Sequence, residues 1–388
     1  MPHPARIAVM LPRFSRYGGV EAYAWRLAEA LAMRGHEVDF ICARQETEAP
    51  EGVNVRAVGR PPGFKVVKML WYLVRAEMLC RREQYDLVFS LGKTWNQDIL
   101  RSGGGPQDIF WRLSREAWPS GFPRACKDIA RKLQPANWLT LFIERRMYSR
   151  TPHIVAVSDV VRGWIEEAYP HLAEEGSCQT VYTMYNCPDM THFTPPDQTE
   201  RAEARCLLGG NEDQYALGIA TTNFALKGIT PLINALVHLP GNTTLHVAGG
   251  RKPEKYAALA ASLGVADRVF FHGKVSDMRR FYHGLDMFVL PTFYDTLANV
   301  VLEAMSSGVK TLCSNRAGAS AFLPPSQIIV NPGDEREIAD KILRLKATEG
   351  VLPFVPKGGG LDELVALTEK VLSLKKQKRD DGGSVRTR

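Results

Sequence analysis

One stretch decides the fold of this chain: YDTLANVVLEAMSSG, residues 294–308. It follows an apolar run at 287–291, which predicts a buried parallel strand. A loop then carries Asp295, and a helix is expected to begin by Asn299, with Glu303 about two turns above the loop. A helix N-terminus at a strand end favours an anion, because its free amides and its dipole both attract negative charge. Open α/β sheets bind ligands at that edge, so an anionic ligand is expected here.

The same alternation of strand and helix runs through the whole chain. Strands are expected at 6–12, 38–43, 53–58, 86–90, 154–158, 217–221, 244–248, 269–272, 287–290, 310–314 and 327–330. Helices are expected up to Arg34 from the first glycine turn, at 64–82, 160–168 and 361–377, and from near Lys227, Lys255, Met278, Asn299, Ala317 and Glu335. This order predicts an α/β protein with two doubly wound, Rossmann-like domains facing a cleft.

The length of 388 residues favours two domains over one core. Residues 187–214, rich in proline and then in charge, indicate a linker. We therefore expect domains at 1–188 and 189–360. The helix at 361–377 could return to the first domain, and the basic tail at 378–388 is expected to be disordered.

Positive charge is concentrated in the first part of the chain. Residues 1–150 hold 24 Lys and Arg against 15 Asp and Glu, whereas the remainder holds 25 against 27. This surplus favours an anionic partner, such as a membrane surface or an acidic acceptor, with a solvated basic surface as the alternative. The seven cysteines are scattered without a CxxC pair, and no run of 18 apolar residues occurs. We expect a cytoplasmic protein without disulfide bonds or a membrane span.

A segment at roughly 93–150 interrupts the first domain and mixes aromatic with basic residues. Such a mixture suits a membrane interface, where rings lie at headgroup level and cations meet anionic lipid. The alternative is a helical excursion that packs against its own domain. The residues of this expected membrane patch are Phe110, Trp111, Arg112, Arg115, Trp118, Arg124, Lys127, Arg131 and Lys132.

Two further positions are candidates for holding an anion. Gly18 and Gly19 follow the first strand and would let the backbone approach a phosphate or sugar, although a tight turn has the same pattern. Lys227 follows the 217–221 strand and could neutralise a diphosphate as a point charge.

The acidic candidates suit sugar hydroxyls better than proton transfer. Two carboxylates beside a phosphate would repel it, so Asp295 and Glu303 are expected to accept hydroxyl hydrogen bonds. Asp98, in the loop after the 86–90 strand, could hold an acceptor hydroxyl, with a plain turn residue as the alternative. The histidines lack metal-ligand spacing and no GxSxG motif occurs, so neither a metal site nor a serine hydrolase is expected.

Six motifs in order resemble the GT-B glycosyltransferases of family 4, a retaining, nucleotide-sugar-dependent group, and most of all the subgroup that builds the lipopolysaccharide core. The resemblance covers nearly the whole chain. The motifs are the glycine turn Gly18 to Glu21, the strand Ile154 to Ser158, the run Tyr185 to Asp189 with Phe193, the loop Phe224 to Gly228, the strand and turn Phe271 to Val275, and the Glu-x7-Glu motif within 294–308.

The resemblance implies a role for each matching residue. Backbone at Gly19 and the Lys227 side chain would bind the donor diphosphate, with amides near Leu297, Ala298 and Asn299. Backbone near Val275 would meet the base. Glu303 would hold the ribose, Asp295 a donor-sugar hydroxyl, and Asp98 would lie near the acceptor.

The resemblance also implies the reaction. A nucleotide-diphosphate sugar, expected to be UDP-linked, would react by front-face transfer with retention, the departing diphosphate helping to deprotonate the acceptor. No cofactor, metal or nucleic-acid polymer is expected. The expected acceptor is a lipid-linked glycan such as the lipopolysaccharide core, at the inner face of the cell membrane.

Two departures from the family pattern leave alternatives open. Asp295 replaces a Glu, and Ala225 and Leu226 stand where the family carries an Arg, a contact that Arg251 or Lys252 could replace. The alternatives are a catalytically impaired donor-binding partner protein and a nucleotide-sugar epimerase or hydrolase on the same fold.

Overall fold

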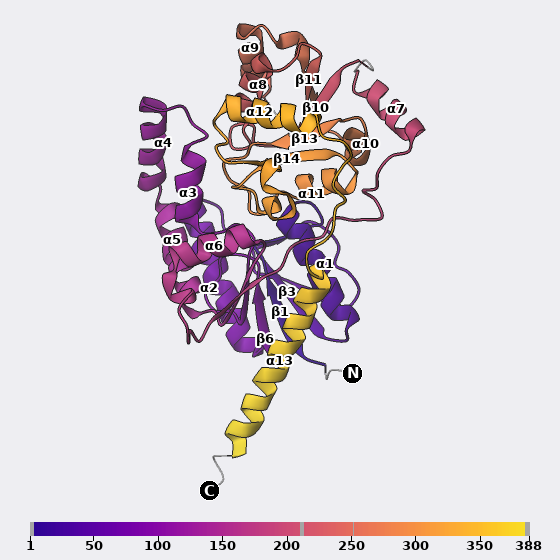
Figure 1. The fold of residues 1–388 in the computed structure, drawn as a ribbon. Helices are drawn as coiled ribbons and strands as arrows, with labels where there is room; N and C mark the ends of the chain where they lie inside the picture. The colour runs from indigo at the N-terminus through magenta and orange to yellow at the C-terminus, as the bar shows by residue number, and fades with distance from the viewer. Residues whose placement is uncertain (1–3, 210–212, 251, 385–388) are drawn as a thin grey trace. The chain divides into compact units, whose positions relative to one another are not determined.

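The computed structural model describes residues 4–209, 213–250 and 252–384, and the chain forms two units (Figure 1). Unit 1 comprises the residues up to Ile109, Cys126–Tyr185 and the residues from Gly358 onward. Unit 2 comprises Phe110–Ala125 and Asn186–Lys357. The chain therefore passes into unit 2 close to the expected boundary at 188, but part of the expected first-domain insertion groups with unit 2.

Unit 1 is built on a parallel sheet in the order β5-β3-β1-β6-β7-β8-β9. Ile7 pairs with Val38 on one side and with Leu87 on the other, and all three side chains are buried. Strands covered on both faces are apolar along nearly their whole length, which explains the runs in the sequence. The strands are β1 (Arg6–Met10), β3 (Glu37–Cys42), β5 (Val53–Ala57), β6 (Leu87–Ser90), β7 (Ile99–Ser102), β8 (His153–Ala156) and β9 (Thr180–Thr183), and β2 (Arg13–Phe14) pairs with β4 (Arg44–Gln45).

Helices join these strands and supply the rest of the unit 1 core. Leu27 and Leu31 on the first helix pack in one buried cluster with Val9 and Phe40 of the sheet. The helices are α1 (Gly19–Met33), α2 (Lys65–Glu83), α3 (Gln107–Arg115), α4 (Phe122–Leu133), α5 (Pro135–Arg150), α6 (Asp159–Ala168) and the short η1 (Pro170–Leu172). Of these, α3 and α4 begin or end in unit 2.

The chain returns to unit 1 in its last helix, α13 (Gly360–Ser384), drawn in yellow in Figure 1. Leu364 and Val365 are buried in the same core cluster as Leu27 of α1. The expectation of a disordered tail from residue 378 is wrong up to Ser384, because the helix continues. Lys375 pairs with Asp98 at 2.8 Å and Arg379 pairs with Asp86 at 3.0 Å, which anchors this part of the helix to the sheet. Residues 385–388 lie outside the described residues.

Unit 2 contains a second parallel sheet, in the order β12-β11-β10-β13-β14-β15. Its strands are β10 (Tyr215–Ala220), β11 (Thr243–Ala248), β12 (Val269–Gly273), β13 (Met287–Leu290), β14 (Lys310–Ser314) and β15 (Ile328–Ile329). Its helices are α7 (Gln198–Leu207), α8 (Ile229–Ala235), η2 (Leu236–His238), α9 (Glu254–Ser262), η3 (Ala266–Arg268), α10 (Met278–His283), α11 (Asn299–Ser306), η4 (Gly318–Phe322), η5 (Pro325–Gln327) and α12 (Glu335–Lys346). Two doubly wound α/β units confirm the predicted fold class.

Three local differences from the sequence prediction have physical causes. The strand β7, ILRS, contains a buried arginine, Arg101, so it lacks the apolar run that predicts a buried strand. The expected linker contains α7, which starts at a capping box in which Asp197 and Glu200 each accept a backbone hydrogen bond. The helix expected near Ala317 is a 3-10 turn, η4.

Candidate active site

The strand order of unit 2 reverses between β10 and β13, so the chain leaves these neighbouring strands in opposite directions across the sheet. Leu217 of β10 pairs directly with Met287 of β13, and both strands are parallel. The loops that follow them begin at the same edge and open a crevice there. Residues 221–228 follow β10, and residues 291–298 follow β13. These two loops carry the predicted Lys227 and Asp295.

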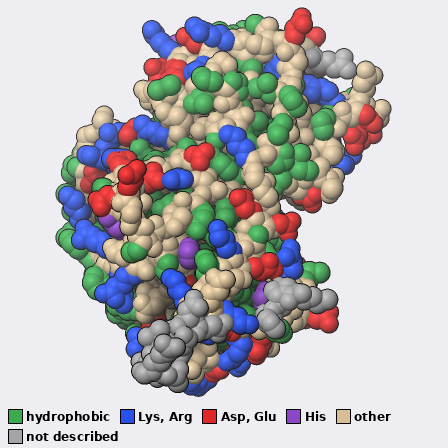
Figure 2. Space-filling model, turned by 60° about the horizontal axis from the view of Figure 1, so that its bottom comes forward, with side chains coloured by type: hydrophobic (Ala, Val, Ile, Leu, Met, Phe, Trp, Pro, Cys, Tyr) green, Lys and Arg blue, Asp and Glu red, His purple; other side chains and the backbone are tan. Residues whose placement is uncertain are grey.

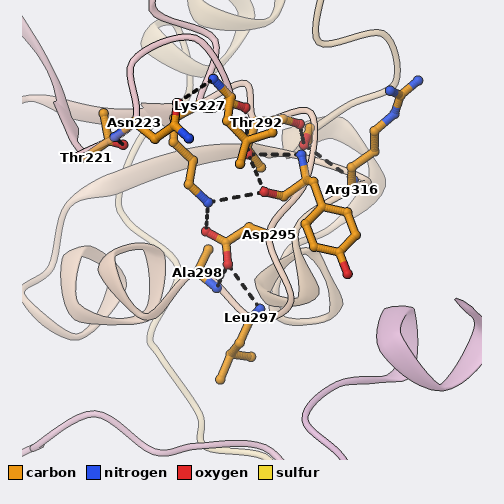
Figure 3. Close-up of polar contacts among 11 residues, drawn as sticks. Thr221, Asn223, Lys227, Thr292, Asp295, Leu297, Ala298 and Arg316 are labelled. Atoms are coloured by element: carbon orange, nitrogen blue, oxygen red, sulfur yellow. Dashed lines mark hydrogen bonds and ion pairs between the residues drawn. The ribbon is translucent and has the colours of Figure 1, made fainter. Parts of the chain in front are cut away.

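Lys227 and Asp295 meet across this switch point (Figure 3). The Lys227 Nζ pairs with Oδ2 of Asp295 and also donates to the carbonyl oxygen of Tyr294 at 3.2 Å. The two side chains are 19% and 18% exposed, so solvent reaches the pair but does not surround it. The structure therefore brings together the two residues that the sequence placed on separate strands.

The second oxygen of Asp295 binds the start of α11. Oδ1 accepts hydrogen bonds from the Leu297 amide at 3.2 Å and from the Ala298 amide at 2.8 Å. Ala298 has φ 65° and ψ 66°, a left-handed conformation that is strained for a residue with a side chain. The Asp295 carboxylate thus stabilises the strained entry into the helix. The first residue of α11, Asn299, is exposed and accepts from Asn186 at 3.5 Å.

A glycine allows the two loops to approach each other. Gly228 has φ 78°, and a Cβ built there would lie 2.1 Å from the carbonyl oxygen of Pro291. The neighbouring Leu226 carbonyl accepts from the Phe293 amide at 2.9 Å and from the Thr292 hydroxyl at 3.2 Å. Leu226 therefore contributes backbone to the site. Lys252 is exposed in the loop after β11, and Arg251 lies outside the described residues.

Glu303 lies on the half-buried side of α11. Its Oε2 accepts a hydrogen bond of 2.8 Å from the hydroxyl of Tyr282 on α10. Burial raises the pKa of the Glu303 carboxyl, while the Tyr282 hydrogen bond and nearby His192 act in the opposite direction. Tyr282 was not singled out in the sequence, because an aromatic residue in a short helix carries no distinctive signal. A role for Glu303 in holding ribose stays a prediction.

The edge of the sheet beside β10 is lined by aromatic rings. Val275 is half-buried in the turn after β12, where a nucleotide base is predicted to bind. Gly250, after β11, has φ 81°, and a Cβ there would lie 2.1 Å from the Phe224 ring. Phe224 also packs against Tyr256 and Phe271 at ring-centroid distances of 5.1 and 6.0 Å. Phe224 thereby anchors the loop that carries Lys227.

The segment Phe110–Ala125 contacts the loop that carries Asp295. The Phe110 ring packs edge-on against Tyr294 at 5.1 Å between ring centroids. Glu116 pairs with the Arg316 guanidinium at 2.7 Å, and the Arg316 carbonyl accepts from the Asp295 amide at 3.0 Å. In Figure 3 the Arg316 side chain extends away from Asp295. Phe110 is therefore a packing residue of unit 2.

The other residues of the expected membrane patch differ in exposure. Trp111 and Trp118 are half-buried, as are the cationic side chains of Arg124, Lys127 and Arg131. Arg124 donates to the Trp118 carbonyl at 2.7 Å. Burial lowers the pKa of both Lys127 and Arg131. The exposed members of the patch are Arg112, Arg115 and Lys132.

Large exposed apolar side chains of unit 1 lie on α2 and α5, and also on α4, at Ile129 (57%) and Leu133 (74%). In Figure 2 hydrophobic and basic side chains are mixed along the left edge, on the side where Figure 1 draws α3 and α4 as well as α2 and α5. Basic residues in α2 include Lys65, Lys68 and Arg75. The exposed apolar residues are Phe64 (83%), Val74 (52%) and Met78 (58%) in and before α2, and Trp138 (65%) and Phe142 (59%) in α5.

In unit 1 the glycine turn lies after β1, where the order of that sheet also reverses. Gly18 has φ 106° and precedes α1, so a residue with a side chain would be strained there. A Cβ at Gly19 would meet none of the described atoms within 4 Å, so local packing does not require this second glycine. Contact of Gly18 and Gly19 with a donor stays a prediction.

The expected position of Asp98 is wrong. The chain crosses back after β6, so Asp98 directly precedes β7 and lies at the amino-terminal edge of the sheet. Its Oδ2 accepts from the Val88 amide at 2.8 Å, and its Oδ1 pairs with Lys375 at 2.8 Å. Asp98 therefore anchors α13. Because β7 contains the buried Arg101, it lacks an apolar pattern, and a residue at the start of this strand resembles the end of the loop after β6.

A residue of the same loop does lie beyond the carboxyl end of β6. Lys93 pairs at 2.7 Å with Glu144 of α5, whose side chain is 2% exposed. Glu144 also accepts from the Gln107 amide at 2.8 Å and from the Tyr169 hydroxyl at 3.3 Å. This buried carboxylate joins the loop after β6 to the first turn of α3. Lys93 and Glu144 are far apart in the sequence, so no local sequence pattern indicates that they form an ion pair.

Two further observations concern what the chain could bind. Among the described residues, no three His, Cys, Asp or Glu side chains are grouped so that they could hold a metal ion. Within the same part of the chain, no helix is both long and apolar enough to cross a membrane. A metal-independent reaction stays a prediction.

Comparisons with known proteins agree with this architecture. A family model described as Glycosyl transferases group 1 matches residues 216–347, and one described as Glycosyltransferase Family 4 matches residues 17–97. The chain is 29% identical to the lipopolysaccharide glucosyltransferase WaaG of Escherichia coli K12, over 89% of this chain and 90% of that protein.

Solved structures show the same fold. The crystal structure of WaaG, a glycosyltransferase involved in lipopolysaccharide biosynthesis, matches with a TM-score of 0.71 at 19% identity, over 96% of this chain and 95% of that one. HepE of Anabaena, solved with UDP and glucose, matches with a TM-score of 0.60 at 16% identity, over 98% and 100% of the two chains.

The two doubly wound units have the GT-B fold. The chain belongs to the group 1 and family 4 glycosyltransferases. It is thus an enzyme of the hexosyltransferase type, as the sequence predicted.

Proposed function

We propose that this enzyme transfers a sugar, with retention of configuration, from a UDP-linked donor to a lipid-linked glycan such as the lipopolysaccharide core. One observation carries the proposal: Lys227 lies at the switch point of unit 2, beside the amides that open α11. A cation and the amides of a helix start at this position suit a diphosphate. The similarity to a lipopolysaccharide glucosyltransferase supports the choice of acceptor class, and a fold neighbour solved with UDP supports the nucleotide.

The proposed donor extends from β12 to α11 along the edge of the sheet. The base binds the backbone near Val275, Glu303 accepts from the ribose hydroxyls, and Lys227 neutralises the diphosphate. Glu303 suits this task because it is half-buried and already accepts a hydroxyl hydrogen bond from Tyr282. A carboxylate can accept further O–H donors at its second oxygen.

The chemistry proposed for this site depends on the departing group. As the bond from the sugar to the diphosphate breaks, negative charge grows on the diphosphate, and a preorganised cation stabilises that charge. The diphosphate oxygen then takes the proton of the acceptor hydroxyl on the same face of the sugar. Lys227 holds the leaving group for both events, so the reaction needs no protein nucleophile.

The acceptor side of the proposal places unit 1 at the cytoplasmic face of the cell membrane. The first 150 residues are basic, and the exposed apolar side chains of α2 and α5 lie among Lys and Arg residues. Apolar side chains that enter the interface and cations that meet anionic lipid act together in such binding. A lipid-linked acceptor would be presented at that surface.

A turnover assay tests the proposal. The protein is incubated with UDP-glucose or UDP-galactose and truncated lipopolysaccharide, and UDP release is followed together with glycan mass. We expect acceptor-dependent release that is lost in Glu303→Ala and retained in Glu349→Ala, an exposed glutamate of the same unit. Absence of transfer with every nucleotide sugar tried, from a folded protein, would contradict the proposal.

Leu226 favours one second candidate, a donor-binding partner protein without turnover. Its side chain brings no charge to the loop where the family pattern has an arginine, and the loop contributes the Leu226 carbonyl instead. The two candidates give different results in one experiment. Calorimetric binding of UDP-glucose without any transfer would identify the binding protein, whereas transfer identifies the enzyme.

A further inference from the structure

The Asp295 carboxylate already occupies the groups that the proposed donor diphosphate needs. Its Oδ2 pairs with Lys227, and its Oδ1 accepts from the amides of Leu297 and Ala298 (Figure 3). Both ends of the carboxylate are therefore engaged, one by the cation and one by the helix entry. A diphosphate and this carboxylate cannot bind the same lysine and the same amides together, because two anions would face each other there.

The backbone around Asp295 is held independently of its side chain. The Asp295 amide donates to the Arg316 carbonyl at 3.0 Å, and the Asp295 carbonyl accepts from the Gly318 amide at 3.1 Å. These bonds form an isolated parallel bridge between Asp295 and Ala317. Rotation of the side chain alone can therefore release Lys227 and the two amides, without unfolding the loop.

Release of the carboxylate has different consequences for two ligands. A bare nucleoside diphosphate displaces it and offers no hydrogen-bond donor in return. A nucleoside diphosphate sugar offers sugar hydroxyls next to the diphosphate, and a carboxylate accepts such donors well. Only the sugar-bearing ligand compensates Asp295 for the contacts that it loses.

We propose that Asp295 is a specificity-determining residue, which exchanges Lys227 and the α11 amides for hydroxyls of the donor sugar and so disfavours the bare nucleoside diphosphate. The inference rests on the proposed function and deepens it. It also assigns a use to the short side chain, which reaches both Lys227 and the helix entry from one loop position. The same exchange weakens binding of the diphosphate product, so that product release follows sugar transfer.

Asp295→Asn tests the exchange, because the amide keeps an acceptor oxygen for the helix entry and removes only the charge. Affinities for UDP and for UDP-glucose are measured by calorimetry without acceptor, with ADP and GDP titrated in parallel. We expect UDP to bind about tenfold more tightly to the variant, the size of one charge-assisted contact. UDP-glucose is expected to gain less, so the preference of the site for the sugar-bearing ligand falls. Asp295→Ser, which also retains a capping oxygen without charge, is a second variant if the first folds poorly.

A double-mutant cycle separates exchange from simple repulsion between Asp295 and the ligand. In a Lys227→Met background the exchange has no cation to release, so the gain caused by Asp295→Asn is expected to shrink to about twofold or less. Repulsion alone would leave the gain unchanged, which would overturn the inference.

The matched control is Asp334→Asn in the same unit. Asp334 also accepts from two amides at the start of a helix, from Arg336 at 3.0 Å and from Glu337 at 3.1 Å. UDP affinity should not change in this variant. If the wild type binds UDP and Asp295→Asn binds it no more tightly, the inference fails while the proposed function stands. If the wild type binds none of the three nucleoside diphosphates and none of the nucleotide sugars, the proposed function itself fails.

Discussion

The hydroxyl of Tyr282 on α10 donates a 2.8 Å hydrogen bond to Glu303 on α11. Tyr282 is fully buried, so its ring cannot turn away without opening the packing against Phe193 and Phe288. The glutamate predicted to hold the ribose is thus oriented by a residue whose own side chain is held in place by aromatic packing. Tyr282 therefore joins the predicted site as a residue that positions Glu303.

Tyr282→Phe should weaken donor binding while preserving the fold. The ring still fills its cavity, but Glu303 loses the bond that orients it, so we expect KM for the donor to rise about threefold to tenfold. Steady-state kinetics with varied donor measure this. Tyr215→Phe is the matched control, because the buried Tyr215 hydroxyl lacks a hydrogen-bond partner among the described residues. An equal rise of KM in both variants would contradict the positioning role.

The raised pKa of Glu303 determines whether its contribution to the stability of the protein rises or falls with pH. Burial is the largest cause, and it favours the protonated carboxyl in the folded enzyme. The folded state then binds more protons than the unfolded state, so the stability contribution of Glu303 is present at low pH and is lost as pH rises through the folded pKa.

Glu303→Gln removes this dependence. The free energy of unfolding of the wild type minus that of the variant should fall as pH rises above about 4, the ordinary pKa of a glutamate, as measured by denaturant titration. In a Tyr282→Phe background the fall should be larger, because loss of the Tyr282 hydrogen bond raises the pKa of Glu303 further. A difference that increases with pH would show that the sign is wrong.

Lys227→Met should abolish most turnover. The methionine keeps much of the length of the side chain, but it removes the cation at the switch point, so we expect kcat to fall about 100-fold or more. Lys310→Met provides the comparison, because Lys310 also donates to backbone carbonyls in unit 2, those of Leu345 and Thr348. Loss of activity in both variants together would indicate damage to the fold.

Gly228→Ala should destabilise unit 2. An alanine there combines φ 78° with a Cβ only 2.1 Å from the Pro291 carbonyl oxygen, so the two site loops must separate. We expect a loss of about 2 kcal/mol or more in the free energy of unfolding. Gly241→Ala, where a Cβ would meet none of the described atoms within 4 Å, is the control. Equal stability of the two variants would show that the loops adapt.

Sedimentation with liposomes should separate two candidate membrane surfaces. If unit 1 binds anionic lipid through α2 and α5, Trp138→Ala with Phe142→Ala reduces binding to phosphatidylglycerol vesicles, which also falls at high salt. Trp111→Ala with Arg112→Ala tests the patch expected from the sequence. Binding that ignores lipid charge, or that survives both double substitutions, would remove the membrane proposal.

The sequence predicted those parts of the fold whose signals are local. Met287 to Leu290 is an unbroken apolar run, and it forms β13 with those bounds. The start of α11 at Asn299 was also predicted, because the loop chemistry changes there to apolar residues at helical spacing. By contrast, β7 contains the buried Arg101, whose guanidinium carbon lies 3.8 Å from the centroid of the Tyr23 ring. No local sequence pattern indicates this tertiary contact.

The sequence predicted which residues belong to the site better than it predicted the hydrogen bonds that they form. Lys227 and Asp295 could be assigned to neighbouring loops from the strand order, and the structure brings them together. Asp295 also caps α11, and this contact depends on the left-handed conformation of Ala298. An alanine in the sequence does not indicate such a conformation. The sequence misplaces Asp98 because the eight residues between β6 and β7 return the chain to the other edge of the sheet without a distinctive local pattern.

Because α13 supplies Leu364, Val365 and Leu367 to the unit 1 core, that core is assembled from segments that precede and follow unit 2 in the sequence. When synthesis has reached residue 357, all of unit 2 has been made, but α13 has not. Unit 2 can therefore fold while unit 1 still exposes apolar surface on α1 and β1, a period in which chaperones would bind. Completion of unit 1 waits for α13, so unit 2 can mature before unit 1 although unit 1 begins earlier in the sequence.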